Sequence, residues 1–127
     1  MKRLWLALVC FIITASLCTF EIIYATSSAN ELNKLVSQAR EEFDSGKGES
    51  GKAAHILDRA CKLWEEREQV MNMFLYHDSV ERVGVGIKCA KSLVASEKQE
   101  ADSQMIEILG LLETIKKSEQ PTIENIF

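Results

Sequence analysis

The chain has 127 residues, of which 46% are hydrophobic and 27% are charged, and its formal net charge is −4 at neutral pH. This length and composition suit one compact domain with one additional segment. Beyond Tyr24 acidic residues outnumber basic ones and the two signs are interspersed. That surface lacks the basic patch that nucleic acid selects, so we expect no nucleic-acid partner.

The amino terminus carries an apolar segment. The 17 residues LWLALVCFIITASLCTF, residues 4–20, contain no charge, and continuing to Tyr24 gives 21 residues with only Glu21 ionisable. At 1.5 Å per residue the 21 residues form a helix of roughly 31 Å, which is enough to cross a bilayer core. Glu21 lies near one end, where a carboxylate can reach the headgroups. We therefore expect a single membrane span from Leu4 to Tyr24.

The next question is whether this segment is retained. Signal peptides have apolar cores of about 7 to 15 residues, and this one is longer, which favours an uncleaved anchor over residues 1–25. Cleavage after Ala25 or Ala29 is the alternative and would release a soluble domain. Lys2 and Arg3 precede the span, and basic residues stay on the cytoplasmic side. The pattern predicts a protein of the cytoplasmic membrane with its amino terminus inside and residues 30–127 outside.

The outer part shows helical periodicity throughout. We expect helices from about Asn30 to Ser45, from Ser50 towards Tyr76, from a DSVE capping box that begins at Asp78, and through LLETIKKSE to a stop before Pro121. The residues expected to face inward are Leu32, Leu35, Val36, Ala39, Phe43, Ala53, Leu57, Ala60, Trp64, Met71, Phe74, Val80, Val83, Ile87, Ala90, Val94, Ala101, Met105, Ile108, Leu112 and Ile115.

Short connections between such helices make neighbours antiparallel. The fold class expected is therefore all-α, with an N-terminal transmembrane helix followed by a small antiparallel bundle of about four helices in two hairpins.

Residues 46–52, GKGESGK, match the first seven positions of a phosphate-binding loop. The eighth position, which should supply a hydroxyl to magnesium, is Ala53. A phosphate-binding loop also follows a buried strand, whereas this stretch follows a helical pattern. We interpret it as a connection between two helices and expect no nucleotide or other cofactor.

Other chemical motifs are sparse. His77 beside Asp78 would suit an acid/base pair, but Asp78 is also expected to cap a helix. His55 and His77 are the only histidines, which supplies a zinc site poorly, so we expect no metal. Gly84 and Gly86 lack the third glycine of a dinucleotide-binding motif and are interpreted as positions where helices approach closely.

Two of the four cysteines, Cys10 and Cys18, fall in the span. Cys61 and Cys89 are expected to lie roughly 7 Å apart along the axes of two neighbouring helices, which is too far for an unstrained disulfide. We therefore expect two buried reduced thiols. Trp64 is expected in the core, although an exposed Trp64 would be a candidate contact for a partner.

The carboxyl terminus, TIENIF, brings Ile123, Ile126 and Phe127 to one side of a final short turn. These side chains either fold back over the open end of the bundle or are bound by a partner that recognises apolar groups beside a free carboxylate. They are, with Trp64, the candidate partner-binding residues.

The segments KLWEERE, YHDSVERV, LLETIKKSE and TIENIF, together with the basic start and single span, resemble a bacterial family of single-pass helical proteins known as domain of unknown function 4363. The resemblance extends over nearly the whole chain, although the glycines at 84 and 86 are atypical. It implies a membrane setting and carries over no catalytic residue, because none is established for that family.

Together these patterns predict a membrane-anchored extracytoplasmic helical module that binds an envelope or membrane protein and has no catalytic activity. The alternatives are a secreted soluble binding domain and an enzyme that uses His77 and Asp78.

Overall fold

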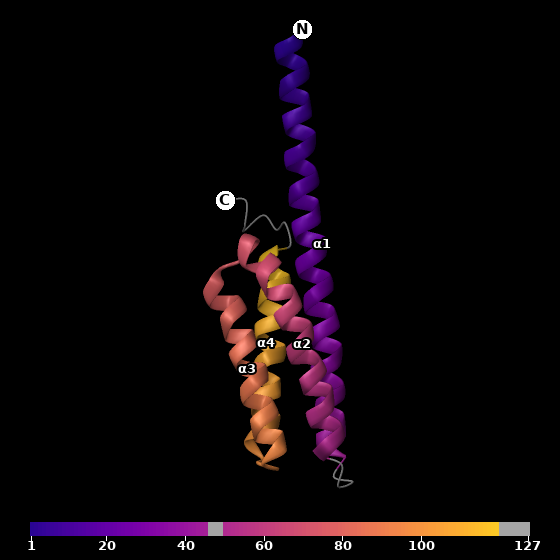
Figure 1. The fold of residues 1–127 in the computed structure, drawn as a ribbon, viewed down its shortest axis with the longest axis vertical. Coiled ribbons are helices and arrows are strands. Elements are labelled where there is room, and N and C mark those ends of the chain that lie inside the picture. Colours follow the sequence, from indigo (N-terminus) through magenta and orange to yellow (C-terminus); the bar gives the residue numbers. More distant parts are fainter. Residues whose placement is uncertain (46–49, 120–127) are drawn as a thin grey trace.

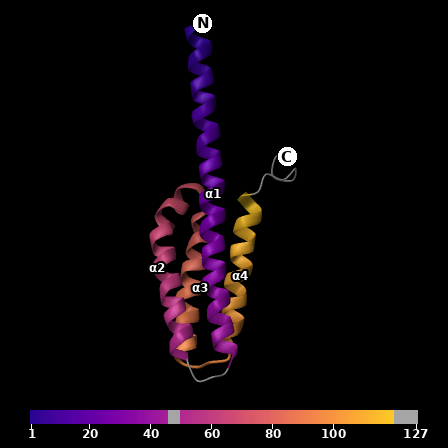
Figure 2. The ribbon, with the colours of Figure 1, turned by 90° about the vertical axis from the view of Figure 1, so that its right-hand side faces the viewer.

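The computed structural model describes residues 1–45 and 50–119. They form four helices, α1 (Lys2–Asp44), α2 (Ser50–Phe74), α3 (His77–Ala95) and α4 (Glu100–Glu119), and no strand occurs in these two ranges. Successive helices run antiparallel, and α1 packs against both α2 and α4 while α3 packs against the same two (Figures 1 and 2). The arrangement is a closed four-helix bundle in which α1 and α3 are diagonal. The expected all-α antiparallel fold is confirmed.

The first helix is longer than the sequence predicted. We expected a span ending near Tyr24 and a separate helix from Asn30, but α1 continues without interruption through both. No glycine or proline occurs between residues 2 and 44, so no residue there breaks the helix. Ala25, Ser28 and Ala29, in the stretch expected to join the two helices, are buried against the bundle. The amino-terminal half of α1 projects beyond the other helices (Figure 1).

Each helix contributes five of the buried apolar residues in the described ranges, so the core is shared evenly. They are Ala25, Ala29, Leu32, Val36, Ala39, Ala53, Leu57, Ala60, Trp64, Met71, Val80, Val83, Ile87, Ala90, Val94, Ala101, Met105, Ile108, Leu112 and Ile115. The stripes predicted for α3 and α4 are confirmed in full. Leu35, Phe43 and Phe74 are only partly buried, at the edges of their stripes.

Polar pairs also join α1 to α4. Arg40 Nε donates a hydrogen bond to Asp102 Oδ1 at 2.5 Å, close to the start of α4. At the other end of α4, Lys116 Nζ donates to Asn30 Oδ1 at 3.1 Å. Because an aspartate near a helix start and a lysine near a helix end both suit the helix dipole, these pairs favour the observed direction of α4.

The start of α3 differs from the expected capping. Asp78 does not cap α3, because the helix begins at His77 after Tyr76, whose side chain makes no capping hydrogen bond. At the far end, Glu97 has φ 54° and its N–H reaches Val94 O at 3.0 Å, while Lys98 N–H reaches Leu93 O at 3.0 Å. This is a Schellman ending of α3 with glutamate where glycine is usual.

Candidate functional site

The projecting half of α1 is exposed on every side. All residues from Lys2 to Phe20 are exposed, and α1 contains a stretch that is long and apolar enough to cross a membrane, none of it buried. The hydroxyls of Thr14, Ser16 and Thr19 each donate to the carbonyl four residues earlier, at 2.8 to 2.9 Å. Their polar groups are therefore satisfied within the helix, as a hydrocarbon environment requires.

Arg67 of α2 marks the level at which α1 enters the bundle. Its guanidinium carbon lies 5.3 Å from the centre of the Tyr24 ring. The same guanidinium donates to the buried hydroxyl of Ser28 at 3.3 Å and to Glu31 Oε2 at 3.4 Å. One cation thus contacts three successive turns of α1, and the cation–π contact and hydrogen bonds compensate its partial burial.

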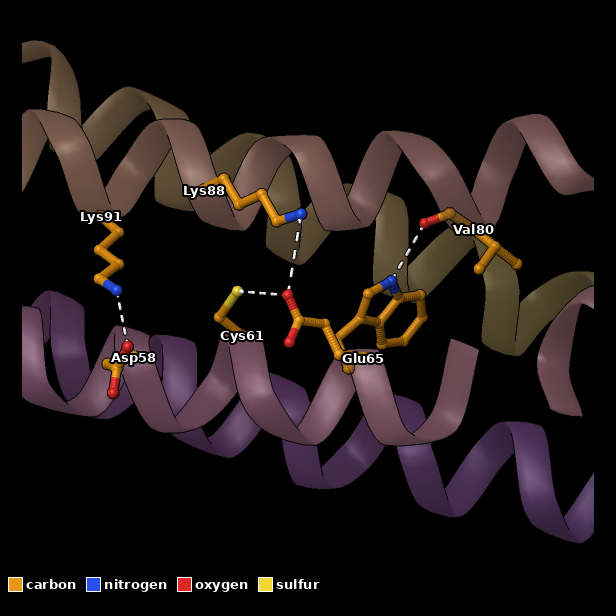
Figure 3. Close-up of polar contacts among 7 residues, drawn as sticks. Asp58, Cys61, Glu65, Val80, Lys88 and Lys91 are labelled. Carbon is orange, nitrogen blue, oxygen red and sulfur yellow. Dashed lines mark hydrogen bonds and ion pairs between the residues drawn. The ribbon is translucent and has the colours of Figure 1, made fainter. Parts of the chain in front are cut away.

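Trp64 is the largest fully buried side chain and centres the contact between α2 and α3. Its indole Nε1 donates to Val80 O at 3.1 Å (Figure 3). Gly84 lies next to the ring, and a Cβ at that position would be in ordinary contact with Trp64 Cδ1 at 3.4 Å. With only 1% of its surface exposed, Trp64 is a core residue, as expected, and offers no surface to a partner in the folded bundle.

Two ion pairs also join α2 to α3 (Figure 3). Lys91 Nζ donates to Asp58 Oδ1 at 2.6 Å, and Lys88 Nζ lies 3.8 Å from Glu65 Oε1. The hydrogen bond from Lys91, followed by that from Lys62, lowers the pKa of the Asp58 carboxyl. The hydrogen bond to Asp58 likewise raises the pKa of the Lys91 ammonium. Both groups are therefore held in their charged forms near neutral pH.

The two cysteines of the bundle are free and differ in exposure. Cys61 is partly buried, and its Sγ donates to Glu65 Oε1 at 3.7 Å. Burial and then the charge of Glu65 raise the pKa of the Cys61 thiol, which keeps it protonated and unreactive. Cys89 is exposed, so the expectation of two buried thiols was wrong for this residue. It lies on the side of α3 that faces a groove rather than the core.

His77 and Asp78, which the alternative enzyme interpretation would use as an acid/base pair, have different partners. His77 Nδ1 lies 3.1 Å from Asn72 Oδ1 and its Nε2 lies 3.9 Å from Glu81, while Asp78 faces Arg82 at 3.9 Å. Both residues are exposed on the first turn of α3. Within residues 1–45 and 50–119, no three His, Cys, Asp or Glu side chains converge on a point that could hold a metal ion.

A groove of about 510 Å³ runs between α3 and α4. Its lining residues are Asp78, Glu81, Arg82, Val85, Gly86, Cys89, Gln104, Glu107 and Leu111. Val85 is 60% exposed there. Below it the helices approach closely, since a Cβ on Gly86 would lie 3.1 Å from Ile108 Cγ1. The expectation that a glycine allows close helix approach is confirmed at Gly86, whereas a Cβ at Gly84 would make only an ordinary contact. The groove itself was not predicted, although the successive helices α3 and α4 form it.

The phosphate-loop motif and the carboxyl-terminal tail lie partly or wholly outside the described residues. Ala53 is buried in α2, Lys52 is exposed in its first turn, and a helix precedes the motif where a phosphate-binding loop needs a strand. Residues 46–49 are not described. Ile123, Ile126 and Phe127, the other candidate partner contacts, are also outside the described residues.

Comparison with known proteins identifies the family. A family model described as Domain of unknown function (DUF4363) matches residues 19–126. This match covers most of the chain, which belongs to that family, as the sequence resemblance indicated. It begins at Thr19 and so includes the level at which the apolar half of α1 enters the bundle. No curated protein and no solved structure matches the chain.

Proposed function

We propose that this chain is a membrane-anchored helical module that presents its bundle outside the cytoplasmic membrane and binds an envelope or membrane protein without catalysing a reaction. The observation that supports it is the double character of α1. One half is apolar and exposed on all sides, and the other half supplies a quarter of the buried core. A helix of this kind connects a bilayer rigidly to a folded domain.

The contacts of the junction favour a retained anchor over a released domain. Cleavage after Ala29 would remove Ala25, Ser28 and Ala29 from the core, together with two of the groups that Arg67 contacts. Cleavage after Ala25 would still remove the Tyr24 ring. The released domain would keep Arg67 partly buried with fewer partners, at a cost to its stability.

The groove between α3 and α4 is the surface we propose for the partner. Because α3 is diagonal to α1, this groove is partly turned away from the anchor helix (Figure 2). It combines an apolar group, Val85, with a charged rim, which is the usual anatomy of a binding surface. The rim holds Asp78, Glu81 and Glu107 against Arg82 alone, so it favours a partner segment with an apolar side chain beside basic ones.

In-cell photo-crosslinking tests this proposal. A photoreactive amino acid at Val85 of the full chain is expected to give a discrete adduct with another membrane or envelope protein. The same amino acid at Gln38, which is exposed on α1, is the matched control and is expected to give none. A second chain, with residues 1–24 replaced by a foreign span, distinguishes partners that need the native anchor. Equal labelling from both positions, or from neither, would refute the groove as a partner site.

A further inference from the structure

A second exposed apolar surface lies at the end of the bundle from which α1 projects. The turn between α2 and α3 lies at the end from which α1 projects (Figure 1). Met73, in the last turn of α2, is 77% exposed, and Tyr76, in the turn itself, is 85% exposed. The other exposed large apolar side chains of the described residues lie between Met1 and Ile23, apart from Val85 and Ile106. The location of Met73 and Tyr76 beside that segment therefore requires an explanation.

An aromatic contact fixes the level of the turn along α1. The ring of Phe74, at the end of α2, meets the ring of Phe20 edge-on with centres 6.3 Å apart. Phe20 also contacts Tyr24, with ring centres 5.6 Å apart. The carboxyl end of α2 thus reaches back to a residue of the apolar segment itself. The end of the bundle overlaps the last turn of the predicted span.

The depth of this contact follows from helix geometry. Phe20 precedes Tyr24 by four residues, or about 6 Å of rise, so it lies just inside the outer boundary of a span that ends at Tyr24. A helix end packed on Phe20 lies within a few ångströms of the same boundary. Amphipathic groups settle in this layer, about 5 to 10 Å deep, and Tyr is enriched there.

Glu21 and the exposed His77 and Asp78 lie at the level of the headgroups, and the polar contacts between α1 and the other helices begin one turn further from the membrane. Arg67 stacks on Tyr24 and pairs with Glu31, and Lys116 pairs with Asn30. The order along α1 is therefore apolar segment, aromatic layer and charged layer. This is the order of hydrocarbon, interface and water. The turn between α2 and α3 lies at the same height along α1 as the aromatic residues Phe20 and Tyr24.

We infer that the turn between α2 and α3 is a second membrane contact, in which Met73 and Tyr76 insert among the headgroups of the leaflet that α1 leaves. The inference rests on the proposed anchoring by α1. The bundle then lies with its end on the bilayer, held at two points, and cannot rotate freely about α1. The far turn around Glu97 points away from the membrane.

Tryptophan quenching by brominated lipids tests this inference in the full chain, reconstituted in phosphatidylcholine and phosphatidylglycerol vesicles. The background chain carries Trp5→Phe, which leaves the buried Trp64 as a constant baseline. Three reporters are added singly: Leu17→Trp within the span, Tyr76→Trp in the turn, and Gln99→Trp at the far end of the bundle. All three replaced side chains are exposed.

We expect Tyr76→Trp to be quenched at least about twofold more than Gln99→Trp, and more by lipids brominated near the headgroup than by lipids brominated near the chain end. Leu17→Trp should be quenched most by the deeper bromines. If Leu17→Trp is quenched while Tyr76→Trp matches Gln99→Trp, the second contact is refuted and the anchor stands. If Leu17→Trp is not quenched, the proposed anchoring fails and the second contact fails with it.

Discussion

The two halves of α1 have the same backbone and opposite surroundings. From Lys2 to Phe20 every side chain is exposed, and apolar residues cover all sides of the helix. From Ala25 to Ala39 the buried residues recur every three or four positions and the remaining positions are largely polar. A helix with an apolar stripe packs that stripe against other parts of a protein, whereas a helix that is apolar on all sides is stable when buried or in lipid. One uninterrupted helix thus combines a segment apolar enough to cross a membrane with a segment that packs in the bundle.

The boundary between the exposed half of α1 and the bundle is set by the side chains that pack around the helix. No break in the backbone marks it. The contacts of Phe20 with Phe74 and of Tyr24 with Arg67 define where protein begins to surround α1. A substitution should therefore affect bundle stability strongly on one side of this level and hardly at all on the other.

The largest contrast is expected between the two tryptophans. Trp64→Ala should lower the free energy of unfolding of the bundle by about 3 to 5 kcal/mol, because it empties a large buried volume and leaves Val80 O without its indole partner. Trp5→Ala is the matched control in the exposed half and should leave bundle unfolding unchanged. Thermal unfolding followed by circular dichroism of the full chain in detergent measures both. If Trp5→Ala lowered the stability of the bundle as much as Trp64→Ala, the exposed half of α1 would not be independent of the bundle.

A pair of alanines gives a smaller contrast within α1 itself. Ala29 is fully buried against the bundle, so Ala29→Leu should cost about 1 to 3 kcal/mol through overpacking. Ala15 is exposed, and Ala15→Leu should leave the unfolding of the bundle unaffected. The same denaturation curves compare them. A bundle that tolerates leucine equally at both positions would show that the core does not extend to Ala29.

The sequence predicted the helices and their inward faces well, because periodicity reflects which residues meet the core. It predicted the start of the bundle poorly. The span was expected to end at Tyr24 and the next helix to begin near Asn30, yet Ser28 between them is buried in α1, and Arg67 supplies its hydrogen bond from another helix. Local sequence does not contain that information.

The candidate site was harder to predict than the fold. The groove depends on how closely α3 approaches α4, which the contact of Gly86 with Ile108 determines. The sequence indicated Gly86 as a position of close helix approach, but it did not show which helix approaches it. Cys89 was misplaced for a related reason, since its position two residues after the buried Ile87 turns it towards this groove.

The stability of the bundle should depend on pH through the ion pair of Asp58 with Lys91, whereas the exposed half of α1 should contribute no such dependence. The pKa of Asp58 is lowered from 3.8 by Lys91 and Lys62 in the folded state, so the stabilisation is present above that value and is lost as pH falls through the lower folded pKa. Lys91→Met should make the acid-induced fall in melting temperature shallower below about pH 4. Lys2→Met, at the exposed end of α1, is the control. If the melting temperature of Lys91→Met falls with decreasing pH as steeply as that of the native chain, the ion pair does not contribute to the pH dependence of stability.

The smallest effect is expected at Lys52, in the phosphate-loop motif. Lys52→Ala should change the free energy of unfolding by less than about 1 kcal/mol, as for other exposed charged residues. Neither the native chain nor the variant should bind ATP, which isothermal titration calorimetry can measure. ATP binding that disappears with Lys52→Ala would overturn the interpretation of this motif.

Whether one helix connects the membrane to the bundle can be tested by determining the amino-terminal sequence of the protein isolated from its own membranes. Mass spectrometry of the intact chain is expected to give a species that retains Lys2, Arg3 and the whole apolar segment, recovered in the membrane fraction. A mature protein that begins at Thr26 or Asn30 and is found outside the membrane would contradict this connection.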